Sequence, residues 1–421
     1  MGDCSAGRRR VLFLSHYFPP ECNAPAWRVF EVCRRWVRWG WDVTVVTCVP
    51  NSPQGRAYED YRNRLWQWET VEGIRLLRLW TYLAANRGRV RRTLNYLSYM
   101  LSACLASGWL ERPDVIVATS PHIFCGWAGA IVSLLKRRPL VLDIRDIWPE
   151  SIGAVGAISS QAVLAALGVL ERAMYVRAAH IVTVGEGYRQ RLIARGVPAE
   201  RISIVTNGVD AEIFHPQPGG EEIRSRYGLG AAFVCIYAGT IGMACGLEVV
   251  LAAAEMLRLQ GRQDIRFLLV GDGAERHALQ QRCRSLGLDN VTFAGRQDRR
   301  DVPRFLAAAD AVLVHLKRRE AFRTVLPSKI FEAASMAKPI ILGVEGCAAE
   351  LVRAAGAGLC ITPEDPQGLL DAIETLAGDP PGRQAMGQAG HDYVTRHFDR
   401  SALARAYLDI VSRLAGEDST D

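Results

Sequence analysis

The chain has 421 residues, of which 49% are hydrophobic and 23% charged, and it contains no low-complexity tract. These values exclude a disordered protein and are sufficient for two globular domains. Residues 1–10 and 416–421 are expected to fray. The apolar run Val11–Ser15 is too short for the core of a signal peptide, so no export is predicted.

The net charge of +7 is unevenly distributed: residues 1–205 carry 27 Lys and Arg against 16 Asp and Glu, and residues 206–421 carry 24 against 28. A basic front half suits nucleic acid, anionic lipid or a phosphorylated substrate. The arginines are scattered and form no recognisable nucleic-acid-binding motif, which disfavours nucleic acid as a partner. The eleven cysteines form no CxxC pair. They suggest reduced thiols in a cytosolic protein, and no metal site is expected.

Short apolar runs alternate with longer amphipathic stretches along the whole chain, a pattern typical of an α/β protein with parallel sheets. A front sheet is predicted from the runs 11–15, 42–47, 74–79, 115–119, 140–144, 180–184 and 202–205. A second sheet is predicted from 233–238, 265–270, 291–294, 311–315, 339–342 and 358–361.

Residues that break regular structure crowd the segment 215–220 between the two sets of strands. We therefore predict an N-terminal Rossmann-like domain over 1–210 and a C-terminal one over 211–396, with a last helix at about 397–415 packing back on the first. Ligands of open α/β sheets bind beyond the carboxyl ends of the strands, so the two sheets are expected to face each other across a cleft.

A glycine-rich segment, Gly239–Gly246, follows the predicted strand 233–238 and precedes a helix. Glycines at such a turn let the backbone approach a ligand, and the amide groups of a helix N-terminus attract an anion such as diphosphate. The alternative is a tight strand-to-helix turn. The candidate ligand-binding residues of this segment are Gly239, Thr240, Gly242 and Gly246.

A second glycine turn, with Gly271 and Gly273, follows the neighbouring predicted strand 265–270. Two such turns at one edge of a sheet indicate a ligand site more strongly than either does alone. Neither turn has the GxGxxG spacing of a dinucleotide site, which counts against NAD.

The segment after Pro327 is predicted to begin a helix with Ser328 and Lys329 in its first turn and Glu332 one turn later. The polar groups of the first turn can meet a phosphate, and a carboxylate at Glu332 can bind the two hydroxyls of a ribose. The alternative is a surface helix in which Glu332 simply favours the positive N-terminus.

These segments, in this order, resemble the C-terminal half of family 4 retaining glycosyltransferases, which have the GT-B fold. Four segments of the front half also resemble this family: 17–21, 51–55, 143–151 and 207–210. The most similar subfamily builds bacterial O-antigen and capsule polysaccharides and includes N-acetylfucosamine transferases. The resemblance implies a UDP-linked sugar donor, an N-acetylated hexosamine or deoxyhexosamine as the transferred sugar, and a lipid-linked acceptor. It also implies transfer with retention that needs no metal or other cofactor.

The resemblance also implies roles for individual residues. It places Glu332 on the ribose, Gly239–Gly246 against the diphosphate, and Glu21 and Asn23 near the diphosphate and the acceptor. Arg145 and Asp146 would lie at the carboxyl end of strand 140–144, where they could orient the donor sugar or the acceptor; an ion pair closing the strand end is the alternative.

The sequence departs from the family pattern at several positions. Thr324 stands where many members have Glu, and Thr240 and Cys245 stand where the glycine loop usually has Arg and Lys. Lys329, one of four lysines in the chain, is therefore the leading candidate to neutralise the diphosphate. Arg145 replaces a His that often precedes the Asp. These changes indicate altered donor handling.

Four arginines, Arg87, Arg89, Arg91 and Arg92, precede the uncharged stretch 93–110. Basic residues beside an apolar helix suit docking on anionic lipid, so the protein is expected to attach peripherally to the inner face of the plasma membrane. The stretch also suits a core helix of the front domain.

Two other functions remain open. A non-hydrolysing nucleotide-sugar epimerase shares the architecture but needs acid and base carboxylates. A non-catalytic nucleotide-sugar-binding subunit is suggested by Thr324, Thr240 and Cys245, whereas Lys329 and Glu332 argue for an active enzyme.

Overall fold

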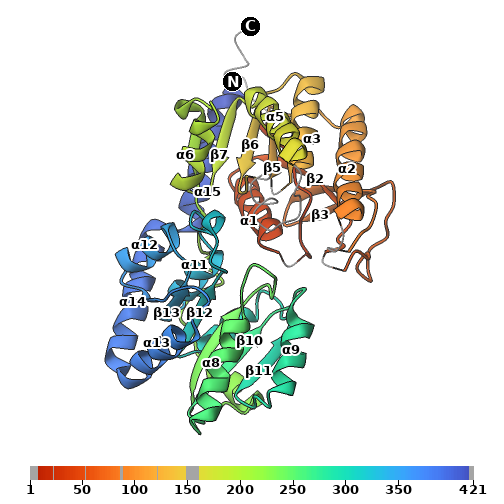
Figure 1. Cartoon of the computed structure of the whole chain (residues 1–421). Coiled ribbons are helices and arrows are strands. Elements are labelled where there is room, and N and C mark those ends of the chain that lie inside the picture. Colours follow the sequence, from red (N-terminus) through yellow and green to blue (C-terminus); the bar gives the residue numbers. More distant parts are fainter. Residues whose placement is uncertain are drawn as a thin grey trace. The chain divides into compact units, whose positions relative to one another are not determined.

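The computed structural model describes residues 8–21, 23–52, 54–85, 89–120, 122–147 and 161–416. The chain divides into two compact units between Thr206 and Asn207 (Figure 1). Described residues up to Thr206 form unit 1 together with those from Ser401 onward, and Asn207–Arg400 form unit 2. Arg87 and residues 148–151, named above, lie outside the described residues.

Unit 1 is built on one sheet of eight strands. In spatial order these are β3 (Trp66–Val71), β4 (Ile74–Leu79), β2 (Asp42–Cys48), β1 (Arg10–Leu14), β5 (Val115–Ser120), β6 (Leu140–Ile144), β7 (His180–Thr183) and β8 (Ile202–Ile204). Every neighbouring pair is parallel except β3 and β4, which pair antiparallel through a turn at Glu72 and Gly73. The expected strands of this sheet are confirmed, but its antiparallel edge strand was missed.

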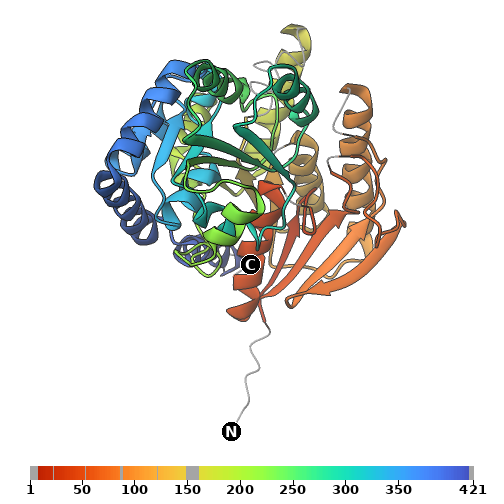
Figure 2. The same cartoon turned by 90° about the horizontal axis from the view of Figure 1, so that it is seen from below.

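Alternate residues of these strands feed two core layers, one on each face. Helices α1 (Ala24–Arg38) and α15 (Arg400–Gly416) cover one face. Helices α2 (Arg89–Ala106), α3 (Ile123–Lys136) and α5 (Gln161–Arg177) cover the other, and α6 (Glu186–Ala194) follows β7 (Figures 1 and 2). The short 3-10 helices of this unit are η1 (Ser107–Trp109) and η2 (Ala199–Arg201).

Unit 2 has six parallel strands in the order β11 (Val291–Gly295), β10 (Ile265–Val270), β9 (Phe233–Ala238), β12 (Ala311–His315), β13 (Ile340–Gly343) and β14 (Gly358–Cys360). The chain order reverses between β9 and β12, as in a doubly wound Rossmann sheet. Helices α8 (Glu248–Leu259), α9 (Arg276–Ser285) and α13 (Pro366–Gly378) pack on one face. The opposite face carries α7 (Gly220–Arg226), α10 (Val302–Ala307), α11 (Ser328–Ser335), α12 (Cys347–Ala354) and α14 (Pro380–His397).

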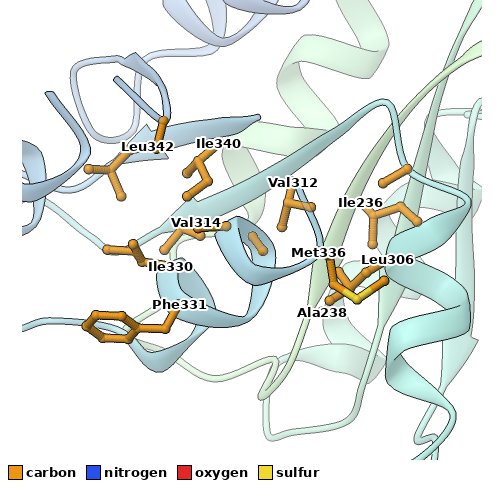
Figure 3. Close-up of a cluster of buried hydrophobic side chains, with 14 of the residues drawn as sticks. Ile236, Ala238, Leu306, Val312, Val314, Ile330, Phe331, Met336, Ile340 and Leu342 are labelled. Atoms are coloured by element: carbon orange, nitrogen blue, oxygen red, sulfur yellow. The ribbon is translucent and has the colours of Figure 1, made fainter. Parts of the chain in front are cut away.

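The core beneath α11 fixes the position of that helix (Figure 3). Ile330 and Phe331 are buried against strand residues that include Val314 and Leu342. The apolar side of α11 faces the sheet, which leaves Ser328, Lys329 and Glu332 only partly buried. The amphipathic pattern of this short helix therefore presents its polar residues at the end of the sheet.

Helix α15 is held on unit 1 by Trp36 of α1. The Trp36 indole is fully buried, donates from Nε1 to the Ala404 carbonyl at 3.0 Å, and meets the Tyr407 ring edge-on at 5.2 Å between centroids. We expect Trp36→Ala to reduce the free energy of unfolding by about 3–5 kcal/mol, because it leaves a cavity and removes the hydrogen bond to the Ala404 carbonyl. Urea unfolding followed by circular dichroism measures this. Trp109→Ala, in the same unit but exposed, is the control; equal losses in both variants would contradict the proposed packing role.

Candidate functional site

The candidate residues of unit 2 gather where the strand order reverses. The loop after β9 and the segment after β12 meet through two contacts: Lys317 N donates to the Ala244 carbonyl at 2.8 Å, and His315 Nδ1 lies 2.7 Å from the Cys245 carbonyl oxygen. Such a reversal point is where open α/β sheets bind ligands. The sequence indicated the loop but gave no sign of the His315 contact.

The two glycine turns pack directly on each other. A Cβ on Gly271 would lie 1.9 Å from the Gly239 carbonyl oxygen, and one on Gly273 would lie 2.2 Å from the Ile241 carbonyl oxygen. Backbone hydrogen bonds join the turns: Gly239 N to Val270 O at 2.8 Å and Ile241 N to Asp272 O at 2.9 Å. Both positions therefore exclude any side chain. Gly242 differs, since the nearest atom to its Cβ position is 3.6 Å away.

Lys329 lies over the start of the first glycine turn. A Cβ on Gly239 would come within 2.3 Å of Lys329 Cε, and the Lys329 ammonium sits 5.1 Å from the centre of the Tyr237 ring. No carboxylate of the described part of the chain forms an ion pair with it. The helix that carries it begins at Ser328 after Pro327, as predicted, and no side chain caps its N-terminus. An ammonium group and uncapped amides thus share one place beside the turn.

A second lysine approaches the other end of the same turn. A Cβ on Gly246, at φ 58°, would lie 3.0 Å from Lys317 Cγ. The neighbouring His315 ring is buried and bonded on both sides, since its Nε2 accepts from Glu364 N at 2.9 Å. Burial lowers the pKa of His315, so the ring is neutral and holds the loop in place. Lys317 was not singled out by the sequence, because only the fold brings it beside Gly246.

Glu332 forms an ion pair with Arg299, whose Nη1 lies 3.3 Å from Glu332 Oε1. The Arg299 guanidinium also stacks 5.1 Å from the centre of the Phe214 ring. Both charged side chains are about 85% buried, with exposed fractions of 14% and 16%. The Glu332 carboxylate is therefore oriented by the guanidinium of Arg299, which lies 33 residues earlier in the chain.

The departures from the family pattern have local structural consequences. The Tyr237 hydroxyl donates to the Thr240 carbonyl at 2.6 Å and lies 3.1 Å from Cys245 Sγ, so Cys245 is part of the buried support of the loop. Thr324 has a buried hydroxyl without a hydrogen-bond partner among the described residues. Neither Thr240 nor Cys245 brings a positive charge to the loop. The positive charges beside it belong to Lys329 and Lys317.

In unit 1, Glu21 and Asn23 both support local backbone. Glu21 is 1% exposed, and its Oε1 accepts from Asn51 N at 3.1 Å and Ser52 N at 2.9 Å. Burial raises the pKa of the Glu21 carboxyl from 4.5 to about 7, although these backbone donors oppose the rise. Asn23 caps α1, since its Oδ1 accepts from Ala26 N at 2.9 Å.

Arg145 lies in a buried network rather than in a simple pair with Asp146. Its Nη2 donates to Thr119 Oγ1, and its Nε lies 3.8 Å from Asp143 Oδ2. Asp143 also meets Arg28 Nε at 3.5 Å. Burial lowers the pKa of Arg145, and the carboxylate of Asp143 opposes that change. Asp146 follows at the end of the strand, where its charge adds to the effect of burial in raising the pKa of Tyr188.

A buried aromatic cluster at the ends of β1 and β5 was missed by the sequence analysis. The His122 ring stacks on Tyr96 with centroids 3.9 Å apart, and His16 meets His122 edge-on at 4.7 Å. His122 Nδ1 accepts from Cys125 N at 3.2 Å and thereby caps α3. Burial lowers the pKa of both rings, that of His16 to about 3. Two neutral imidazoles thus lie at the reversal point of the first sheet, next to β1 and β5.

Comparison with known proteins identifies both halves of the chain. Residues 23–208 match the family described as "Glycosyl transferase 4-like domain", and residues 221–393 match "Glycosyl transferases group 1". The chain is 24% identical over 407 residues to the "Putative colanic acid biosynthesis glycosyl transferase WcaI" of Escherichia coli K12, covering 94% of this chain and 96% of that one. It is 28% identical over 244 residues to a "GDP-mannose-dependent alpha-(1-6)-phosphatidylinositol monomannoside mannosyltransferase" of Mycobacterium tuberculosis, covering 57% of this chain and 62% of that one.

The fold is also that of solved structures. Sucrose-phosphate synthase of Thermosynechococcus elongatus superposes with a TM-score of 0.78 at 18% identity, covering 98% of this chain and all of that one. HepE of Anabaena, solved with UDP and glucose, superposes with a TM-score of 0.72 at 20% identity, covering 96% of this chain and all of that one. The two Rossmann-like units therefore define a protein of the GT-B class. Both halves of the chain match glycosyltransferase models, a 4-like domain in front and a group 1 domain behind, so the chain is a glycosyltransferase.

The contact between the glycine turns predicts unequal effects of two alanine substitutions. Gly271→Ala places a methyl group against the Gly239 carbonyl at a backbone φ of 138°. We expect it to cost at least about 2 kcal/mol of unfolding free energy and to distort the turn. Gly242→Ala is the matched control and should cost less than about 1 kcal/mol. Chemical denaturation of both variants measures the difference; a harmless Gly271→Ala would mean that the turns are not in contact.

The environment of Glu21 predicts a pH-dependent contribution to stability. Its raised pKa means that the folded state holds this proton more tightly than the unfolded state, so stability falls as pH rises from about 4.5 to about 7. Glu21→Gln keeps an oxygen for the two backbone donors but does not titrate. The free energy of unfolding of the wild type, relative to the variant, should therefore fall by up to roughly 3 kcal/mol across that range. Parallel curves for the two proteins across that range would show that Glu21 is not buried as described.

Proposed function

We propose that the chain transfers a sugar from a nucleotide diphosphate donor, UDP-linked, to a lipid-linked acceptor in the synthesis of cell-surface polysaccharide. The observation that carries this proposal is the arrangement in unit 2 of Gly239, Lys329 and Glu332 around the reversal point of the sheet. These three residues match the parts of such a donor. The backbone at Gly239 can approach the diphosphate, the Lys329 ammonium can neutralise its charge, and the Glu332 carboxylate can bind the ribose hydroxyls.

Breaking a sugar–diphosphate bond develops negative charge on the departing phosphate, so a site for this reaction needs positive groups already in position. Lys329 and Lys317, at the two ends of the loop 239–246, supply charge where the family's usual Arg and Lys are replaced by Thr240 and Cys245. The uncapped N-terminus of α11 adds amide donors beside Lys329. We propose that these groups stabilise the leaving nucleotide, without a metal ion, and that the sugar is transferred with retention.

Arg299 extends the proposed role of Glu332. An ion pair at 3.3 Å through Oε1 leaves Oε2 to accept a hydrogen bond from a ribose hydroxyl. A carboxylate oxygen is a strong acceptor for such a hydroxyl. In this proposal Arg299 positions Glu332 and Glu332 binds the nucleoside.

The acceptor side rests on the relatives. WcaI is named for colanic acid biosynthesis, and the mycobacterial relative for a lipid-linked mannoside. The mycobacterial name supports a lipid-linked acceptor for this chain as well, and we propose that this acceptor lies at the cytoplasmic face of the membrane. A hexosamine or deoxyhexosamine as the transferred sugar, and O-antigen or capsule as the product, remain predictions from the resemblance. Arg145 and Asp146 remain the proposed contacts of unit 1 to the sugar or acceptor.

Donor binding is tested by thermal denaturation with a panel of UDP-, GDP- and TDP-sugars and no acceptor. A ligand that binds only the folded state at a hundred times its dissociation constant stabilises by about 2.7 kcal/mol. We expect stabilisation by the UDP class. Lys329→Ala and Glu332→Ala should each weaken binding about 10- to 100-fold, because each removes a charged hydrogen-bond partner.

Arg258→Ala is the control for loss of a surface charge, since this arginine lies exposed on α8 of the same unit and should leave the stabilisation unchanged. Stabilisation by GDP-sugars alone would show that the donor nucleotide carries guanine and not uracil, and it would still support a donor site in unit 2. The proposal fails if no nucleotide stabilises the protein, or if both substitutions leave the stabilisation intact.

A further inference from the structure

Helix α2 has one side in the core and another that nothing in the described structure covers. Tyr96, Tyr99, Ala103 and Ala106 are buried against the sheet. The opposite side exposes Val90, Leu94, Leu101 and Leu105, the first and last of these by 73%. Spacings of four, seven and four residues place these four side chains along a single stripe. Residues 93–110 were expected to be either a core helix or a membrane contact. The helix has both a side that packs in the core and an exposed apolar side.

Aromatic side chains continue this stripe on both sides. Trp109 of η1 is 59% exposed and packs against Trp66 of β3, with ring centroids 6.1 Å apart. The segment that follows β4 runs beside α2, because Ser102 Oγ donates to the Trp80 carbonyl and Tyr82 N donates to Ser98 Oγ, each at 2.8 Å. Trp80 and Tyr82 are each 39% exposed. We name this surface the aromatic face; it consists of Trp66, Trp80, Tyr82, Val90, Leu94, Leu101, Leu105 and Trp109.

Figures 1 and 2 show α2 and the edge strands together on one side of unit 1. The edge strand β3 exposes alternate residues, Trp66 and Trp68 among them. An exposed hydrophobic edge strand invites pairing with other chains unless it is covered or charged. Indole rings at such an edge need an environment that accepts both an apolar ring and a polar N–H group.

The charges on helix α2 itself are all positive. Helix α2 contains three arginines in its first four residues and no acidic residue. Arg91 is exposed and has no ion-pair partner in the part of the chain that the structure describes. Two acids of the neighbouring elements are paired: Glu111 lies 3.4 Å from Arg10 and 3.6 Å from Arg75, and Glu69 lies 2.6 Å from Arg78. Glu59 and Asp60, which precede β3, are exposed.

We infer that the aromatic face docks unit 1 on an anionic bilayer, lying in the interfacial plane. Leucines on one stripe supply apolar area, Trp and Tyr prefer the interface between headgroups and acyl chains, and the arginines attract anionic headgroups. No helix among the described residues is long and apolar enough to cross a membrane. The inference deepens the proposed function by naming the surface that would bring a lipid-linked acceptor to the protein, but it rests on side chains outside the donor site.

The test is co-sedimentation of the full chain with phosphatidylcholine vesicles, with and without phosphatidylglycerol. We expect binding to the anionic vesicles that weakens with salt. The double variant Leu101→Glu, Leu105→Glu should reduce binding at least about tenfold, because each buried leucine contributes a factor of that order. Arg91→Gln should reduce it roughly fivefold. Leu259→Glu is the matched control: Leu259 is 73% exposed at the end of α8 in unit 2, and its substitution should have no effect.

Two measurements separate this inference from its competitors. Light scattering of the wild type and the double variant tests whether the face instead joins two copies of the chain; a dimer that the variant dissociates, without vesicle binding, would overturn the inference. Equal binding to vesicles lacking phosphatidylglycerol, or equal loss with Leu259→Glu, would also overturn it. Nucleotide stabilisation should be the same in the double variant and the wild type, so a failure of vesicle binding with intact nucleotide binding rejects this surface and leaves the proposed transferase standing.

Discussion

In unit 2, the backbone of Gly271 touches the backbone of Gly239, and the proposed donor site depends on this contact. Two strand ends can come this close only where neither bears a side chain, since a Cβ on Gly271 would overlap the Gly239 carbonyl. The same approach sets the course of the loop 239–246 and leaves room above it for the Lys329 side chain. Helix α11 then holds Lys329 from outside the loop, because its apolar residues are fixed in the core. The positive charge of Lys329 and the backbone of the loop 239–246 thus come from separate elements, and each element is held by its own packing.

This separation explains how the chain can differ from its family in the loop and keep a site of the same chemical character. Where relatives place Arg and Lys in the loop itself, this chain uses Thr240 and Cys245, and Cys245 joins Tyr237 in the buried support. A cation on the loop moves with the loop, whereas Lys329 is fixed by a helix and Lys317 by the strand end after β12. Positive side chains whose backbone is held by packed elements suit a leaving group whose charge grows during the reaction, because less reorganisation is then needed.

The sequence predicted most of the fold, because most strands are buried on both faces and appear as continuous apolar runs. The missed strand, β3, is different: its side chains alternate between exposed and half-buried positions, and it pairs on one side only. Local signals also located α11 after Pro327 and both glycine turns. Contacts between residues distant in the chain could not be predicted in this way. The ion pair of Arg299 with Glu332, the approach of Lys317 to Gly246 and the network of Arg145 with Asp143 all depend on which strands become neighbours.

Unit 1 shows why a motif residue and a site residue need not be the same. Glu21 and Asn23 follow the first strand, where ligand contacts are expected, yet their oxygens hold the Asn51–Ser52 turn and the start of α1. A buried carboxylate with two amide donors fixes a loop more firmly than a solvated one, since leaving those donors unpaired would be costly. The loop it fixes lies beside His16 and Cys48, whose contacts lead on to His122. The residues of the motif therefore act on this end of the sheet through the backbone that they position.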